Sequence, residues 1–79
     1  MKIVRILWRD HFTLSGWQDE NDISALTEGE LCESVGYLVK ETKKVMVLAQ
    51  TIGDDVVSEI TLILGSCVES VEVLTETED

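Results

Sequence analysis

Apolar residues in this chain fall into five short runs, separated by four polar breaks. The runs span residues 2–8, 31–40, 45–52, 57–64 and 68–74. They are rich in Val, Ile and Leu, and none contains Pro, which would remove a hydrogen bond from a strand ladder. Runs of this length bounded by turn residues are typical of β-strands. The pattern therefore predicts an all-β fold of five strands.

The breaks indicate how these strands connect. Two tight turns, at residues 41–44 and 53–55, predict an antiparallel meander. The break at Gly65–Cys67 is too short for a crossover helix and suits a 3₁₀ turn that sends the last strand across the barrel. Gly36 indicates a bulge, a sharp bend or the close approach of another backbone, and a small barrel needs such bends in order to close. We predict a small closed barrel of SH3-like order.

The connection between the first two strands, over residues 10–30, is long for so small a domain. Asn21 and Asp22 can cap a short helical turn over residues 23–26. Apolar residues in the connection predict that it folds back and closes one end of the barrel; they are Phe12, Leu14, Trp17, Ile23 and Leu26. A small α+β domain with a true helix near residues 21–26 is the alternative fold.

Length and charge limit the function. The 79 residues make one domain, assigned to residues 1–74, followed by an acidic tail at 75–79 that we expect to fray. The net charge is −10, from 16 acidic and six basic residues. This charge disfavours nucleic acid as a partner, because nucleic-acid affinity depends on Lys and Arg contacts to phosphate. It favours a basic protein partner, and the alternative is that it only keeps a small apolar barrel soluble.

Neither Cys32 nor Cys67 belongs to a Cys-x-x-Cys pair, so a zinc site is not expected, and no other metal or cofactor is predicted. The first residues do not resemble a signal peptide, and no apolar run has the length of a membrane span. We therefore expect reduced thiols, a cytoplasmic location and no membrane association. Whether the two cysteines lie close together stays open.

Apolar residues outnumber the positions that one small barrel can bury. Ile60, Leu62 and Leu64 alternate with Val57 and Ile63, so the fourth run is apolar on both faces. The second face must be covered by the long connection or by another chain. We expect a homo-oligomer in which strand edges pair between subunits.

Five residues are candidate ligand-binding residues: Trp8, Arg9, His11, Trp17 and Lys40. The two Trp side chains could stack on a flat ligand, and His11 could donate or accept a proton. Each also has a structural interpretation, since Trp8 can fill the barrel and Lys40 can belong to a solvated turn with Lys43 and Lys44. No nucleophile with a partner base and no Gly-rich phosphate loop is present, so catalytic residues and an enzyme are not expected.

Four segments together resemble small Sm-like proteins of phage and environmental origin, whose fold is a variety of the SH3-like barrel. The segments are Trp-Arg-Asp-His at 8–11, Glu-Ser-Val-Gly-Tyr-Leu-Val-Lys-Glu at 33–41, Val-Leu-Ala-Gln at 47–50 and Ile-Leu-Gly-Ser-Cys-Val at 63–68. The resemblance implies a strongly bent five-stranded barrel that forms rings or other homo-oligomers, and it implies no known activity. The chain lacks the N-terminal helix of Sm proteins, and their RNA-binding aromatic, Asn and basic residues have no clear counterpart here.

These observations predict a non-enzymatic, self-associating acidic binding module that acts on a basic protein. A phage origin, which only the resemblance suggests, would place it in the host cytoplasm. The alternative is an oligomeric Sm-like protein that binds a nucleotide or RNA in a pocket at the subunit boundary.

Overall fold

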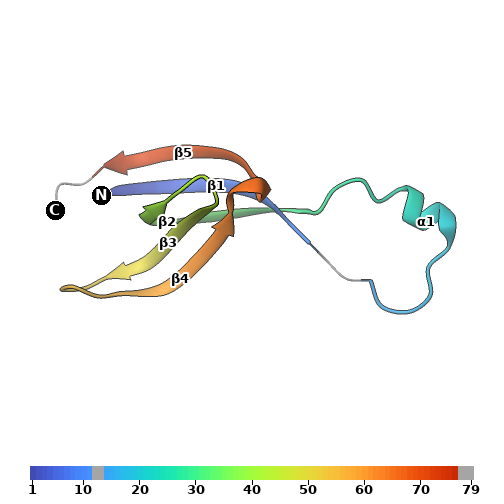
Figure 1. The fold of residues 1–79 in the computed structure, drawn as a ribbon, viewed down its shortest axis with the longest axis horizontal. Coiled ribbons are helices and arrows are strands. Elements are labelled where there is room, and N and C mark those ends of the chain that lie inside the picture. Colours follow the sequence, from blue (N-terminus) through green and yellow to red (C-terminus); the bar gives the residue numbers. More distant parts are fainter. Residues whose placement is uncertain (12–13, 77–79) are drawn as a thin grey trace.

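The computed structural model describes residues 1–11 and 14–76, and its secondary structure is almost entirely β (Figure 1). The strands are β1 (Lys2–Asp10), β2 (Glu30–Glu41), β3 (Val45–Ile52), β4 (Val57–Leu64) and β5 (Val68–Glu76). A short helix, α1 (Glu20–Ser24), lies between β1 and β2, and a 3₁₀ turn, η1 (Gly65–Cys67), precedes β5. The predicted all-β class with five strands is confirmed. Residues 77–79 of the expected frayed tail lie outside the described residues.

The strands form one antiparallel sheet with the order β4-β3-β2-β1-β5. Strands β4 and β5 are its two edges and do not pair with each other, so the sheet is open and the expected closed barrel is wrong for the described part of one chain. Closure requires pairing between strands from the two ends of the sheet, and the pattern of each strand by itself carries no information on that contact.

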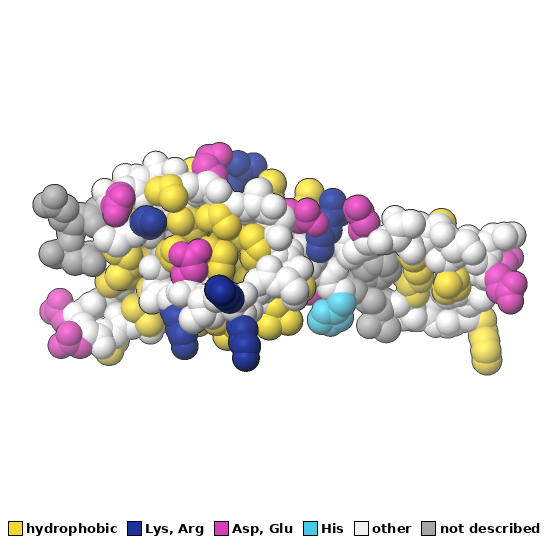
Figure 2. Space-filling model, turned by 45° about the horizontal axis from the view of Figure 1, so that its top comes forward, with side chains coloured by type: hydrophobic (Ala, Val, Ile, Leu, Met, Phe, Trp, Pro, Cys, Tyr) yellow, Lys and Arg dark blue, Asp and Glu magenta, His cyan; other side chains and the backbone are white. Residues whose placement is uncertain are grey.

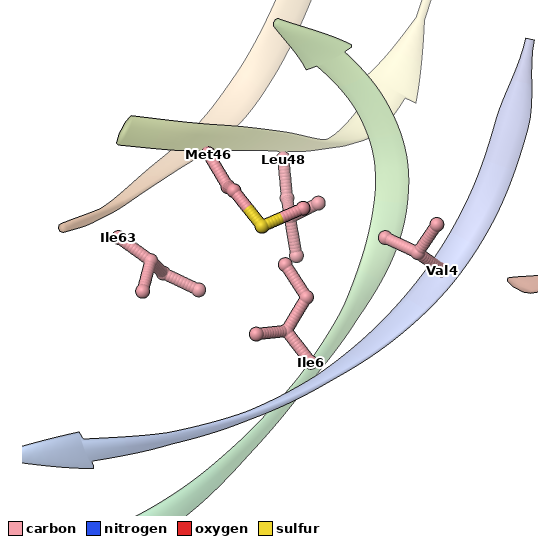
Figure 3. Close-up of a cluster of buried hydrophobic side chains, with 5 residues drawn as sticks. All are labelled: Val4, Ile6, Met46, Leu48 and Ile63. Atoms are coloured by element: carbon pink, nitrogen blue, oxygen red, sulfur yellow. The ribbon is translucent and has the colours of Figure 1, made fainter. Parts of the chain in front are cut away.

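The sheet bends strongly at β2 (Figure 3). The pairing of β2 with β3 shifts between Leu38 and Lys40, as expected for a bulge. Gly36 is buried here, and a Cβ at this position would lie 2.9 Å from the carbonyl oxygen of Ala49. The absence of a side chain at Gly36 therefore lets β3 pack closely on β2 at the bend.

The bend surrounds a small core on one face of the sheet, which we call the inner face. Its buried side chains come from β1, β3 and β4 and point toward one another (Figure 3); they are Val4, Ile6, Met46, Leu48 and Ile63. Trp8, Leu38 and Val68 pack against this cluster and are partly buried. We call the opposite side of the sheet the outer face.

Residues 14–28 form an arm that projects from the sheet (Figure 1) and gives the molecule extents of 53 × 21 × 19 Å. Every residue of the arm is exposed, so the expectation that this connection closes the barrel is wrong for its described residues; Phe12 lies outside them. The pairing of β1 with β2 continues to Asp10 and Glu30, which carries the connection away from the core. Helix α1 begins earlier than predicted, because the Asp19 carboxylate accepts a hydrogen bond from the Asn21 amide at 3.1 Å.

Neither α1 nor any other helical segment of the described residues combines the length and the apolar character that a membrane crossing requires.

Candidate interaction surfaces

Trp8 is part of the interior of the sheet. Its indole Nε1 donates a hydrogen bond to Ser34 Oγ at 3.0 Å, and its ring packs against the core cluster. A buried Trp usually satisfies its N–H in this way. Trp8 therefore helps to fill the inner face of the sheet.

Arg9 lies on the outer face, where carboxylates surround its guanidinium group. It forms ion pairs with Glu28 at 3.2 Å and Glu69 at 3.4 Å, and it donates a hydrogen bond to the carbonyl oxygen of Gly29 at 3.3 Å. Glu28 ends the arm and Glu69 belongs to β5, so Arg9 ties the base of the arm to the edge of the sheet. Each of the three guanidinium nitrogens of Arg9 therefore has a partner within the protein.

Arg5 has a similar environment four residues earlier on the same face. Its guanidinium lies 3.1 Å from Glu33 on β2 and 3.4 Å from Glu72 on β5. Exposed pairs of this kind stabilise a fold weakly, typically by less than about 1 kcal/mol. Their main consequence is for the surface charge, because four carboxylates surround two arginines and the region stays acidic.

His11, Trp17 and Lys40 do not form a shared site with Trp8 and Arg9. The His11 side chain is 94% exposed, and its Nδ1 lies 3.3 Å from an Asp10 carboxylate oxygen. Trp17 is fully exposed on the arm, and Lys40 is exposed on β2 at the bulge. Residues 1–11 and 14–76 enclose no pocket, and they contain no group of three or more His, Cys, Asp or Glu side chains that could hold a metal ion.

Both cysteines are free thiols and are partly buried. Cys32 lies on β2 opposite Trp8, and its Sγ contacts the Glu30 carbonyl oxygen at 3.7 Å. Desolvation raises the pKa of the Cys32 thiol, and the negative charges of Asp10 and Glu30 raise it further. A raised pKa leaves a smaller fraction of the Cys32 thiol as thiolate at neutral pH.

The outer face of β3 and β4 exposes a stripe of aliphatic side chains. Ile60, Leu62 and Leu64 are 51–58% exposed. They pair across the ladder with Ala49, Val47 and Val45, and directly opposed residues of an antiparallel pair point to the same face. The sequence predicted this surplus of apolar side chains on β4, and the single chain leaves it uncovered.

Lysine residues border this stripe at one end. Lys40 pairs with Val47, which pairs with Leu62, so these three residues form one row across the outer face. Lys43 and Lys44 lie in the following turn, where the Lys44 carbonyl accepts a hydrogen bond from Gly65 at 2.8 Å. Among the described residues, no carboxylate forms an ion pair with any of the three lysines. We call this surface, with Val45, Val47, Ile60, Leu62 and Leu64, the lysine-bordered face.

The second edge of the sheet also exposes aliphatic side chains. Val71 and Val73 on β5 pair with Ile6 and Val4, which places them on the inner face, yet they are 43% and 51% exposed. They remain exposed because no strand follows β5 in the sheet. Figure 2 shows hydrophobic side chains open to solvent over the body of the sheet. Both edges therefore combine free backbone groups with apolar side chains.

Comparison with known proteins returned no matching family model, no matching curated protein and no matching solved structure.

Proposed function

We propose that this protein is a non-enzymatic, self-associating acidic binding module with an Sm-like, SH3-like architecture, and that it binds a basic protein. The open edges of the sheet carry the proposal. A β4 edge from one copy and a β5 edge from another can pair, which satisfies free backbone groups and covers Val71 and Val73. The bend at Gly36 and the 3₁₀ turn before β5 are features expected of such an architecture.

The surface area of the chain supports self-association. A compact monomer of 8.8 kDa exposes about 4,800 Å². This chain exposes 6138 Å², a surplus of about 1,300 Å², whereas each partner in a specific complex of standard size buries about 800 Å². The radius of gyration, 16.1 Å, likewise exceeds the value of about 12 Å expected for a compact chain of this length. The single chain therefore has more open surface than a typical complex needs.

Charge supports a basic partner. The net charge is −10, and the outer face around Arg5 and Arg9 keeps a surplus of carboxylates. Such a field speeds association with a basic protein and repels phosphate backbones. The alternative of a nucleotide or RNA pocket at a subunit boundary gains no support from the geometry, because Trp8 is internal and Trp17 lies on the arm.

Light scattering coupled to size-exclusion chromatography tests self-association. We expect the native chain to elute as an oligomer at micromolar concentration. Val73→Lys should weaken the association, because a charged side chain on an edge strand opposes pairing. Val56→Lys is the matched control, since Val56 is 66% exposed in the β3–β4 turn and outside the strands. A native chain of 8.8 kDa at every concentration would refute self-association.

Binding to a basic protein needs a separate test. We expect the native chain to bind a Lys- and Arg-rich peptide in surface plasmon resonance, with an affinity that falls as salt rises. An acidic peptide of the same length is the control. Equal binding of both peptides, or binding that salt does not weaken, would contradict recognition through charge.

A further inference from the structure

The arm has the composition of a docking segment. It exposes four apolar side chains, Leu14, Trp17, Ile23 and Leu26, and Trp17 is fully open to solvent. Its charged residues are all acidic: Asp19, Glu20, Asp22 and Glu28. Figure 2 shows hydrophobic and acidic side chains together at this end of the molecule. Large apolar side chains that are held away from the body of a protein are typical of protein–protein contacts.

The lysine-bordered face has the complementary composition. Its centre is aliphatic, with Ile60, Leu62 and Leu64 more than half exposed. Its border carries Lys40, Lys43 and Lys44, which have no ion pair within the described residues. Arg5 and Arg9, by contrast, already contact two carboxylates each. The three lysines therefore form a group of positive charges that remains available on an acidic molecule.

The arm does not cover the face of its own chain. It points away from the sheet (Figure 1), and the aliphatic stripe on β4 stays open. A second copy supplies both missing partners at once, because each copy has one arm and one face. Two copies can therefore exchange arms about a two-fold axis, which satisfies both contacts in a closed dimer.

We propose that the arm of one copy docks on the lysine-bordered face of a second copy. Leu14, Trp17, Ile23 and Leu26 pack on the aliphatic stripe. Asp19, Glu20 and Asp22 face the lysine border, whereas Glu28 stays paired with Arg9. The inference rests on the proposed self-association and names a contact for it that is distinct from strand pairing at the edges. The surplus surface of the chain is large enough for such a contact.

Charge reversal tests the pairing of the two surfaces. One variant, Lys43→Glu with Lys44→Glu, makes the face acidic; a second, Asp19→Lys with Glu20→Lys and Asp22→Lys, makes the arm basic. Each variant alone should raise the dissociation constant of self-association at least about tenfold, because like charges then oppose each other. Lys2→Glu on β1 is the control and should leave the dissociation constant unchanged. Circular dichroism verifies that each variant keeps its fold.

Mixing the two charge-reversal variants is the decisive step. An acidic arm then meets a basic face, and a basic arm meets an acidic face, so both contacts of the exchanged dimer are restored. We expect the mixture to recover the native dissociation constant. If the native chain is oligomeric but the mixture does not recover the native dissociation constant, arm docking is wrong. The proposal of edge pairing would still stand in that case. A monomeric native chain would instead refute the proposed self-association itself.

Fluorescence of Trp17 provides an independent readout. Docking removes a fully exposed indole from water, so the emission of the native chain should shift to shorter wavelength as concentration rises. Trp17→Ala should abolish this shift, because Trp8 is already internal. An emission maximum that stays constant through the association range would contradict docking of the arm.

Discussion

At the scale of single residues, the two Trp side chains show how differently one residue type is used in this chain. Trp8 is held by a hydrogen bond to Ser34 and packs on the core, whereas Trp17 has no protection from solvent. The basic side chains also differ in whether they have a partner within the described chain. Arg5 and Arg9 pair with carboxylates, and Lys40 does not. Side chains that the fold leaves without a contact are the ones from which we infer recognition.

Cys32 gives a prediction that depends on local electrostatics. Desolvation and the charges of Asp10 and Glu30 raise the pKa of its thiol, so at a given pH a smaller fraction is thiolate. In a Cys67→Ser background, the alkylation rate by iodoacetamide should reach its half-maximum at a higher pH than in the same chain unfolded by denaturant. Asp10→Asn with Glu30→Gln should move the midpoint partly back. Equal midpoints in the folded and unfolded chains would contradict the assignment.

At the scale of elements, the bend in β2 determines which side chains share a face. The bulge between Leu38 and Lys40 skips Val39, and this places Lys40 in line with Val47 on the outer face. Gly36 allows β3 to approach at the same bend. A local backbone feature thus creates both the curvature around the core and the lysine border of the exposed stripe.

Substitution of Gly36 by Ala tests the close approach of β2 and β3. The added Cβ would lie 2.9 Å from the Ala49 carbonyl oxygen and 3.3 Å from Leu48 Cβ, so β3 must move. We expect a loss of roughly 1–3 kcal/mol in the free energy of unfolding, the usual cost of overpacking. Ser70→Ala on exposed β5 should change it by less than about 0.5 kcal/mol. Urea unfolding measures both, and an equal effect of the two substitutions would contradict the packing at Gly36.

The strands could be predicted because a short apolar run bounded by turn residues is a local property, and the bounds of β3, β4 and η1 agree with the prediction. The open sheet could not, because closure depends on a contact between β4 and β5 that neither strand encodes alone. The projecting arm was missed for a related reason. Its apolar residues are equally compatible with burial by their own chain and with burial by another chain, and the sequence does not distinguish the two. The position of Lys40 beside Val47 depends on the bulge in β2. Gly36 was the only residue in the sequence that indicated this bulge.

At the scale of the whole molecule, the chain exposes more surface than its mass requires, in the arm and at both edges of the sheet. A small domain has few buried side chains to stabilise it. Five fully or nearly buried residues make up the core cluster of the described chain. Burial of further apolar surface between copies would therefore contribute a substantial part of the stability of the folded state.

This coupling predicts that thermal stability depends on protein concentration. A partner at about 100 times its dissociation constant stabilises the folded state by about 2.7 kcal/mol. For a domain of this size, each kcal/mol raises Tm by about 4–8 °C. We therefore expect the Tm of the native chain, measured by calorimetry, to rise by about 10 °C or more across the association range. Val73→Lys should reduce this rise, because it weakens edge pairing and leaves the arm contact in place. A native Tm that is independent of concentration would show that one copy is stable by itself, with its arm and edges exposed.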